Sequence, residues 1–336
     1  MSRSGTGLAE EAMAGSRLSL ARLLTQVEND TSEGRSALDW LFPHAGRAHL
    51  IGVTGSPGTG KSSLVNRIAQ AYRSPAGEIS PRTVGVVAID PTSPFSGGAL
   101  LGDRVRMRDL AGDRGVFIRS MASRGTLGGL ARQTAGVVQV LDAVGFDVIL
   151  IETVGAGQSE VDIARLAHTT LVVEAPGLGD EIQAIKAGIL EIADILVINK
   201  ADHPGAANTE RALRGMLEMG YSRQRSHRSK EQPDLDDPIT AEWLPPLLKT
   251  VATEGTGTSE LVQAIDRHLA YLKGHGEWQR RQYERLLNEL DVLVQGTLVS
   301  RWRSGLQEEL YDEVVAQMCD RKISPYQAME KLIKET

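Results

Sequence analysis

A strand followed at once by a glycine-rich loop and a helix is the feature of this sequence that most restricts its fold. The loop matches the phosphate-binding pattern G-x-x-x-x-G-K-[ST], between strand-like residues 50–53 and helix-like residues 64–69. Its backbone N–H groups can turn inward around phosphate oxygens at the positive end of the helix. The residues expected to bind the nucleotide phosphates are Gly55, Ser56, Pro57, Gly58, Thr59, Gly60, Lys61, Ser62 and Ser63. Among them, Lys61 would reach the β- and γ-phosphates and the Ser62 hydroxyl would bind Mg²⁺.

Short apolar segments alternate with helical stretches over residues 48–273. Five of these segments are nearly continuous runs of Val, Ile and Leu, at residues 50–53, 84–89, 148–151, 171–173 and 195–198. Such runs, separated by helices, are typical of a parallel sheet covered on both faces. We therefore expect an α/β fold with a doubly wound, mostly parallel sheet, formed by a P-loop domain over residues 48–273.

An N-terminal helical arm is expected over residues 1–47. Residues 1–15 are small and rich in Gly and Ser, and we expect them to be disordered. Apolar residues at helical spacing predict a helix at residues 16–29, and a second short helix is expected at residues 37–42. Within the P-loop domain, residues 222–240 are crowded with charge, Ser and Pro, which predicts an exposed loop.

A C-terminal helical region is expected over residues 274–336. Helical patterns cover residues 277–303 and 307–320, and a last helix has Ser324 as its N-cap and Pro325 at its first position. Leucines are frequent here, and an apolar stripe of this kind serves internal packing more often than an interface. The leucines concerned are Leu286, Leu290, Leu293, Leu298 and Leu306.

Three acidic residues are candidates to hold the metal ion of a bound nucleotide. Asp90 and Glu152 each end an apolar run, and the carboxyl ends of parallel strands meet at the edge where ligands of such folds bind. Asp103 lies in the glycine-punctuated segment 96–104, whose composition suits a switch loop or a plain surface loop. Mg²⁺ prefers oxygen ligands and keeps several waters, so we expect the carboxylates to hold it beside Ser62 through water.

The sequence N-K-x-D follows the apolar run at residues 195–198 and predicts guanine recognition. Asp202 can accept hydrogen bonds from the N1–H and 2-amino groups of guanine, which adenine does not offer. Asn199 would tie neighbouring loops together, and the stem of Lys200 would pack along the base. A later loop is expected to offer backbone N–H groups to the guanine O6 atom, although Val251 replaces the serine common at its start. This loop comprises Val251, Ala252 and Thr253.

The hydrolytic part of the site departs from the pattern of many small GTPases. Gly155 follows Glu152 at the spacing of D-x-x-G and is expected to sense the γ-phosphate. The next residue is Ala156, where a water-orienting glutamine is common, so we expect slow intrinsic hydrolysis. Lys186, in a segment that opens a helix, is a candidate to face the nucleotide or a partner, or to be an ordinary solvated lysine.

Composition excludes several classes of function. The net formal charge of −6 provides no general attraction to nucleic acid or to an anionic membrane. Cys319 is the single cysteine, so an intrachain disulfide and a cysteine-rich metal site are ruled out, and a reducing, cytoplasmic setting is expected. The apolar runs are far shorter than the roughly 20 residues of a membrane-spanning helix.

Several stretches together resemble the MeaB/ArgK family, the GTPases associated with methylmalonyl-CoA mutase. They are residues 90–93, 96–104, 152–160 and 176–186, and the likeness extends over nearly the whole chain. The resemblance implies a P-loop GTPase domain of the SIMIBI type that binds GTP or GDP with Mg²⁺. It further implies a chaperone that binds an adenosylcobalamin-dependent acyl-CoA mutase and gates cobalamin loading, protection or reactivation. It also implies a homodimer through the C-terminal helices and a switch at residues 176–188 that gives weight to Asp180 and Lys186.

Two alternative functions share parts of this pattern. A GTPase that inserts nickel into urease or hydrogenase has the same general fold, but it needs clusters of Cys or His ligands. This chain offers one cysteine and seven dispersed histidines. A kinase would use the same phosphate loop, but the N-K-x-D sequence argues for guanine rather than adenine.

Overall fold

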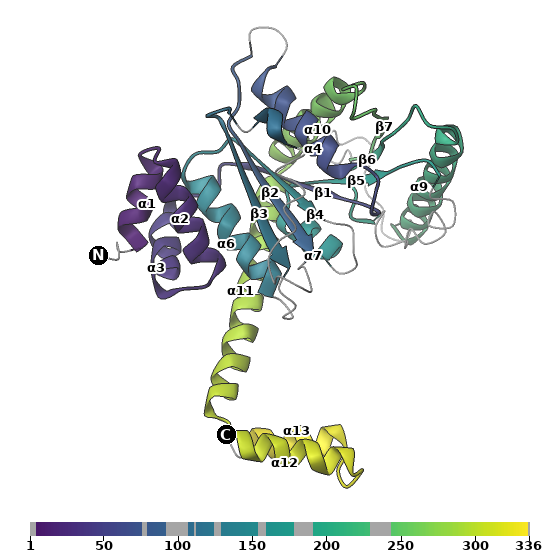
Figure 1. The fold of residues 1–336 in the computed structure, drawn as a ribbon. Helices are drawn as coiled ribbons and strands as arrows, with labels where there is room; N and C mark the ends of the chain where they lie inside the picture. The colour runs from purple at the N-terminus through teal and green to yellow at the C-terminus, as the bar shows by residue number, and fades with distance from the viewer. Residues whose placement is uncertain are drawn as a thin grey trace. The chain divides into compact units, whose positions relative to one another are not determined.

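The computed structural model describes residues 5–75, 79–91, 107–110, 112–123, 129–153, 159–177, 191–228 and 243–334. In this part of the chain, one seven-stranded sheet has the order β3-β2-β4-β1-β5-β6-β7, and all its pairings are parallel (Figure 1). The expected doubly wound α/β fold is confirmed. The strands are β1 (His49–Thr54), β2 (Val84–Pro91), β3 (Val116–Ser123), β4 (Val148–Thr153), β5 (Thr169–Glu174), β6 (Ile195–Ile198) and β7 (Leu247–Lys249).

The sheet has two strands that the apolar runs did not predict. Both β3 and β7 lie at the edges of the sheet. β3 carries Arg119 among its apolar residues, and β7 is only three residues long. Edge strands of this kind are less buried than central ones, so they lack the continuous apolar run that marked the other five.

The helices expected at residues 16–29, 277–303 and 307–320 are confirmed within one or two residues at each end. The helices are α1 (Gly5–Met13), α2 (Arg17–Glu28), α3 (Ser32–Leu41), α4 (Lys61–Arg73), α6 (Gly129–Ala143), α7 (Ser159–Leu166), α9 (Ala206–Arg228), α10 (Thr258–Gly274), α11 (Glu277–Gly305), α12 (Glu308–Cys319) and α13 (Pro325–Lys334), with 3₁₀ turns η1 (Phe42–His44) and η2 (Arg108–Leu110). The N-cap of α13 is as expected, because Gln327 N donates to Ser324 Oγ at 3.3 Å.

Alternate residues of the central strands enter two separate apolar cores. In β1, Leu50 packs in one core with α6 and α7, whereas Ile51 and Val53 pack in the other with α4 and α10. β4 divides in the same way, with Ile149 on the first face and Leu150 on the second. The strand period of two residues produces this division, and it explains why the central strands are apolar throughout.

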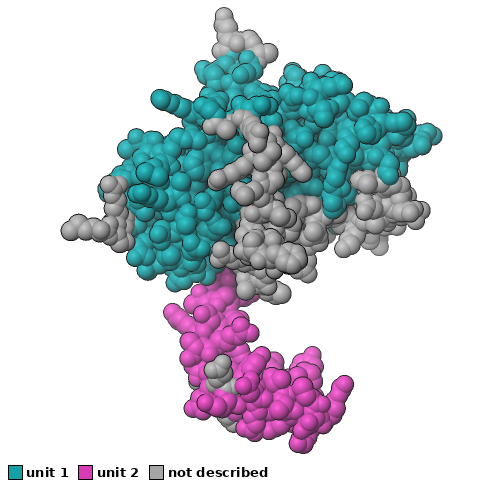
Figure 2. Space-filling view, in the orientation of Figure 1, with its two compact units in different colours: residues 1–285 teal, residues 286–336 magenta. Residues whose placement is uncertain are grey.

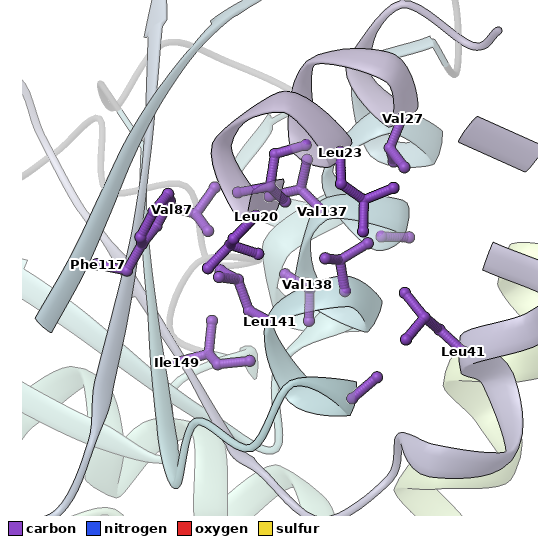
Figure 3. Close-up of a cluster of buried hydrophobic side chains, with 14 of the residues drawn as sticks. Leu20, Leu23, Val27, Leu41, Val87, Phe117, Val137, Val138, Leu141 and Ile149 are labelled. Atoms are coloured by element: carbon purple, nitrogen blue, oxygen red, sulfur yellow. The ribbon is translucent and has the colours of Figure 1, made fainter. Parts of the chain in front are cut away.

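The N-terminal helices continue the first core beyond α6 (Figure 3). Leu23 and Val27 of α2 pack toward Val137 and Val138 of α6. The two helices come close because α6 has a glycine at position 136, where a Cβ would lie 2.8 Å from Val27 Cγ1. The helices α1–α3 therefore share the apolar core on this face of the sheet.

The expectation of disorder over residues 1–15 is wrong for residues 5–13, which form α1. Leu8, Ala9 and Ala12 are buried in the first core. Gly5 lies against the backbone of Glu33, whose carbonyl oxygen would be 1.9 Å from a Cβ at this position. The small residues of this segment, from which disorder was expected, thus permit close packing of α1 against α3.

The loop expected over residues 222–240 is also partly wrong. Residues 222–228 continue α9, and residues 229–242 lie outside the described residues. Arg and Gln are good helix formers, so charge alone does not end a helix.

The chain divides into two compact units, residues 1–285 and 286–336 (Figure 2). The second unit contains the later part of α11 together with α12 and α13. Its small core comprises the buried residues Val314, Ala328 and Leu332, which Trp302 and Leu310 also contact. No helix in the described ranges combines the length and apolar character that crossing a bilayer requires.

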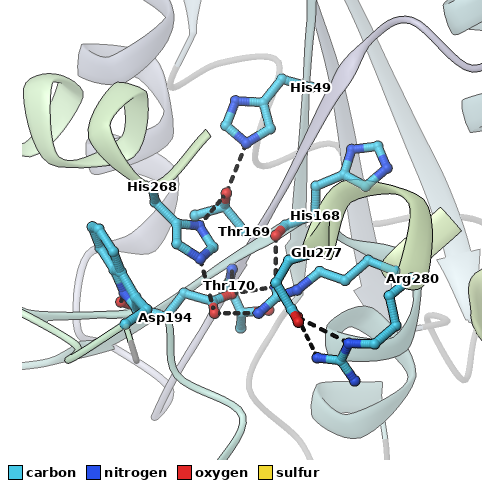
Figure 4. A network of polar contacts seen from close by, with 10 residues as sticks. His49, His168, Thr169, Thr170, Asp194, His268, Glu277 and Arg280 are labelled. Carbon is cyan, nitrogen blue, oxygen red and sulfur yellow. Dashed lines mark hydrogen bonds and ion pairs between the residues drawn. The ribbon is translucent and has the colours of Figure 1, made fainter. Parts of the chain in front are cut away.

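A buried polar network joins the amino-terminal edge of the sheet to α10 and α11 (Figure 4). The Thr169 hydroxyl of β5 lies 2.7 Å from His49 Nε2 and 2.8 Å from His268 Nδ1. His268 Nε2 lies 3.3 Å from Asp194 Oδ1, and Arg281 of α11 donates to both oxygens of this carboxylate. The network therefore links three strands and two helices at the edge opposite the glycine-rich loop.

Burial determines the ionisation of this network. Burial, together with the neighbouring His268, lowers the pKa of His49 to about 3. Burial also lowers the pKa of His168, which lies beside His49, well below its ordinary value. Burial opposes ionisation of Asp194, but hydrogen bonds from Arg281 and His268 outweigh this effect and hold its pKa below the ordinary value. The network thus combines two neutral histidines with an ionised carboxylate.

These pKa shifts predict a loss of stability in mild acid. Below the unfolded-state pKa of 6.5, the unfolded chain binds protons on His49 and His168 that the folded chain does not bind. The free energy of unfolding should therefore fall by about 1.4 kcal/mol per pH unit for each histidine between about pH 6 and about pH 5. Urea denaturation at several pH values measures this slope.

The His49→Asn and His168→Asn variants should each remove one histidine's share of that slope. The His44→Asn variant, at an exposed histidine of η1, is the matched control and should keep the wild-type slope. A wild-type slope that survives in both buried-site variants would contradict this account.

Candidate nucleotide-binding site

The glycine-rich loop leads from β1 into α4 at the carboxyl edge of the sheet. Gly60 is the N-cap of α4, with a φ of +89°. A Cβ at this position would lie 2.5 Å from Asn199 Nδ2, so a larger residue would displace that side chain. The first N–H groups of α4 lack partners within the helix and lie at its positive dipole end. The loop and helix can therefore bind an anionic phosphate group.

Lys61 is the buried cation of this loop. Its Nζ donates to Gly55 O at 2.7 Å and to Ser56 O at 2.8 Å, and the residue is only 5% exposed. Both acceptors are neutral carbonyl groups, whereas a phosphate oxygen carries a negative charge that adds a Coulomb attraction to the ammonium group. The ammonium group can thus exchange these carbonyl partners for phosphate oxygens without leaving the loop.

Two oxygen-bearing side chains meet beside the first turn of α4. The Ser62 hydroxyl donates to Glu152 Oε1 at 2.6 Å, and both residues are buried. Glu152 lies in β4 opposite Val53 of β1, which places it beside the strand that leads into the loop. A hydroxyl and a carboxylate are the hard oxygen donors that Mg²⁺ prefers, so these residues fit a magnesium ion.

Asn199 joins the phosphate loop to the loop that follows β7. Its Nδ2 donates to Thr59 O at 2.8 Å, and its Oδ1 accepts from Thr250 Oγ1 and from Ala252 N, both at 3.1 Å. Asn199 is buried, and it directly follows β6. The Asn199 side chain thus donates to the phosphate loop and accepts from the loop after β7. It acts as a brace between these two parts of the site.

The other residues of the N-K-x-D sequence lie nearer the surface. Lys200 has a φ of +56°, and its Nζ donates to Gly58 O of the phosphate loop at 2.7 Å. The Asp202 side chain is 48% exposed and has His203 Nε2 at 3.8 Å. Asp202 thus presents a carboxylate to solvent, two residues after the lysine that contacts the phosphate loop.

The loop after β7 is closed on itself and tied to α4. Val251 and Thr256 form an isolated antiparallel bridge, and Val251 N donates to Thr256 O at 3.0 Å. Arg67 of α4 donates to Ala252 O at 2.8 Å and to Thr253 O at 2.6 Å. Residues 251–253 therefore lie beside the phosphate site, held from two sides by Asn199 and Arg67.

Several candidate residues cannot be placed in this geometry. Asp103, Gly155 and Lys186 lie outside the described residues. Asp90 is described by its backbone alone, two residues after Ala88, which is opposite Glu152 in the pairing of β2 with β4. The expected third and fourth ligands of a metal ion therefore remain predictions.

Two residues of the site were not predicted from the sequence. Glu174 ends β5 and is buried, and its Oε1 accepts from Ser56 Oγ at 3.4 Å. A glutamate directly after the apolar run 171–173 could have pointed to it, as the acid at position 152 did. No pattern in the sequence points to Arg67, because it is one of several polar residues on a helix. The loop residues that it contacts lie 185 and 186 residues away in the chain.

Comparison with known proteins identifies the family of this chain. The profile of the family "Methylmalonyl Co-A mutase-associated GTPase MeaB" matches residues 20–307. A protein of Pyrococcus abyssi, named as a GTPase, is 42% identical over 328 residues, covering 98% of this chain and 95% of its own length. The GTPase ArgK of Escherichia coli is 35% identical, covering 82% of this chain and 83% of its own.

A more distant relative and a solved structure extend the comparison. The mitochondrial methylmalonic aciduria type A homolog of Caenorhabditis elegans is 28% identical, covering 97% of this chain and 82% of its own. The crystal structure of an LAO/AO transport system kinase superposes with a TM-score of 0.68 at 25% identity, over 98% of this chain and 96% of that one. This chain therefore belongs to the MeaB family and is a GTP-hydrolysing enzyme.

Proposed function

We propose that this GTPase is the chaperone of an adenosylcobalamin-dependent acyl-CoA mutase, with methylmalonyl-CoA mutase as the first candidate. It would gate the loading, protection or reactivation of the cobalamin cofactor, and GTP hydrolysis would reset the complex. The observation that carries the proposal is the match of the mutase-associated family profile to residues 20–307. The relative named for methylmalonic aciduria supports the same client class.

In this proposal the phosphate loop holds the GTP phosphates. N–H groups of the loop and of the first turn of α4 would surround the phosphate oxygens, and Lys61 Nζ would give up Gly55 O and Ser56 O for the β- and γ-phosphates. Because Lys61 is buried, its charge acts in a medium that screens it less than water does. This increases the stabilisation of negative charge that develops during hydrolysis.

Magnesium would be held next to this loop. Ser62 and Glu152 are the described residues that fit it, and Asp90 and Asp103 are the further candidates from the sequence. When bound, the ion would neutralise phosphate charge. Gly155 would sense the γ-phosphate, and Lys186 would couple the switch at residues 176–188 to the client.

Guanine would be recognised through hydrogen bonds to its N1–H, 2-amino and O6 groups. The Asp202 carboxylate would accept from the N1–H and 2-amino groups, and a backbone N–H of the loop at residues 251–253 would donate to O6. Lys200, whose ammonium group is anchored on Gly58 O, would lay its stem along the base. Asn199 supports both contacts, because it braces the two loops that carry the phosphates and the base.

A nickel metallochaperone is the alternative function, and the described residues offer few ligands for nickel. Among the residues described, no group of three or more His, Cys, Asp and Glu side chains could hold a metal ion. His49 and His268 are hydrogen-bonded to Thr169, and His268 also lies beside Asp194. The neighbouring His168 accepts from the backbone N–H of Leu50 through its Nδ1.

We further propose that residues 274–336 form a homodimer. The exposed apolar side chains on α11 recur at helical spacing along one stripe, and Leu290 and Leu298 are 56% and 60% exposed. Stripes of this kind pair with another helix when a partner is present. The side chains of the stripe are Leu287, Leu290, Val294 and Leu298.

The first experiment measures steady-state GTP hydrolysis with and without purified methylmalonyl-CoA mutase. We expect slow basal hydrolysis that the mutase increases. Lys61→Ala should lower the rate by about a hundredfold or more, as removal of one preorganised charge does in other enzymes. Lys249→Ala is the matched control, since this lysine pairs with Glu210 on α9, and it should retain wild-type hydrolysis. Hydrolysis that the mutase leaves unchanged would argue for another client.

Base recognition is tested by Asp202→Asn. An asparagine can donate to the 2-oxo group of xanthine, whereas it loses an acceptor for guanine. We therefore expect GDP affinity to fall by roughly tenfold or more and xanthosine diphosphate affinity to rise. Calorimetric titration measures both, with His203→Asn as the control at the neighbouring exposed residue. Unchanged GDP binding by Asp202→Asn would rule out this carboxylate as the guanine acceptor.

Dimerisation is tested by a charge in the α11 stripe. Leu290→Asp should convert a dimer into monomers, because the dimer would have to bury the new carboxylate. Leu18→Asp, at an exposed leucine of α2, is the control and should leave the dimer intact. Sedimentation equilibrium gives the mass of each variant, and a monomeric wild-type protein at micromolar concentration would refute the proposed homodimer.

A further inference from the structure

Arg67 fastens the loop after β7 to the phosphate-binding helix. It lies on α4 six residues after Lys61, and its Nε and Nη2 donate to Ala252 O at 2.8 Å and to Thr253 O at 2.6 Å. Its Nη1 donates to Gln70 Oε1 on the same helix at 3.1 Å. All three guanidinium nitrogens are thus engaged, and the planar group is held between helix and loop.

The two carbonyl groups held by Arg67 determine where the loop's N–H groups point. In a planar trans peptide, the N–H of Thr253 points opposite to the C=O of Ala252, and so away from Arg67. The N–H groups of Ala252 and Glu254 are already taken up within the protein. The N–H of Thr253 has no acceptor in the described part of the chain. The loop therefore presents this donor for a ligand.

The two side chains that hold the loop after β7, Asn199 and Arg67, also contact or belong to the phosphate site. Asn199 links Ala252 N to Thr59 O of the phosphate loop, and Arg67 links the next carbonyls to α4. Lys61 and Arg67 are six residues apart, which is about 9 Å along a helix. A rigid helix thus sets the position of the loop's donor relative to the bound phosphates.

We propose that Arg67 is a positioning residue for guanine recognition, which directs the Thr253 N–H toward the O6 atom of the base. This inference rests on the proposed function, in which residues 251–253 face the guanine. Without the guanidinium group, the carbonyls of Ala252 and Thr253 are free to turn, and the direction of the N–H group is no longer imposed. Adenine carries a donor amino group at the same ring position, so the positioned N–H also discriminates against adenine.

The test compares nucleotides that differ at position 6 of the base. GDP has an oxygen acceptor there, whereas 6-thio-GDP has a weakly accepting sulfur and keeps the N1–H and 2-amino groups that Asp202 would read. Arg67→Ala removes all the contacts to the loop. Arg67→Lys keeps the charge and the apolar stem but lacks the rigid fork that reaches two successive carbonyls.

A matched control lies on the same helix. Arg73 donates to both oxygens of Asp113 and to Arg82 O, and none of its hydrogen bonds reaches the loop after β7. Arg73→Ala therefore removes an arginine and its hydrogen bonds from α4 without touching residues 251–253. Affinities for the two nucleotides are measured by titration calorimetry, and folding of each variant by thermal unfolding.

We expect the wild-type protein to prefer GDP over 6-thio-GDP. Arg67→Ala should weaken GDP binding by roughly tenfold, the size of one hydrogen bond, and should weaken 6-thio-GDP binding much less, so the preference shrinks. The preference of Arg67→Lys for GDP over 6-thio-GDP should lie between those of the wild-type protein and Arg67→Ala. Arg73→Ala should keep the wild-type preference. If Arg67→Ala does not fold, the test rests on Arg67→Lys, whose preference for GDP over 6-thio-GDP should be smaller than that of the wild-type protein.

Two results would overturn the inference. One is an equal weakening of both nucleotides in the Arg67 variants, which would indicate a structural role only. The other is unchanged GDP binding. If wild-type protein binds ADP as tightly as GDP, the proposed function itself fails, and this result is distinguishable because it requires no variant.

Discussion

Parallel pairing of all seven described strands is the constraint on which the rest of the molecule depends. It brings the ends of β1, β4, β5, β6 and β7 to one edge of the sheet, although they are far apart in the sequence. Several parts of the candidate nucleotide site lie at or directly after these ends: the phosphate loop, Glu152, Glu174, Asn199 and the loop after β7. The chemistry of the site is therefore a consequence of strand direction, and each loop contributes only a few residues.

The same strands begin at the opposite edge, and that edge is also polar and buried. His49, Thr169 and Asp194 stand at or next to the starts of β1, β5 and β6, and they connect through hydrogen bonds and ion pairs to α10 and α11. β1 thus runs from the histidine network at one end to the phosphate loop at the other. The core between the two edges is apolar on both faces, which makes these strands stiff connectors.

The polar groups of the phosphate site already have partners in the protein itself. Lys61 holds two carbonyls of its own loop, Ser62 holds Glu152, and Asn199 holds Thr59. Buried polar groups need such partners, because leaving one unpaired costs about 1–3 kcal/mol. A phosphate group that enters the loop would compete with two carbonyl oxygens for Lys61, and it has the advantage of a negative charge that attracts the ammonium group.

The sequence by itself determined the fold class, five strands, the phosphate loop and the N-K-x-D sequence. These features depend on residues close together in the chain, where periodicity and spacing report directly on structure. Tertiary structure alone decided the edge strands β3 and β7, the helix α1 with its close contact at Gly5, and the partners of Arg67. In each case the deciding interaction joins residues far apart in sequence, such as Arg67 and Ala252, 185 residues away, and local pattern carries no record of such a contact.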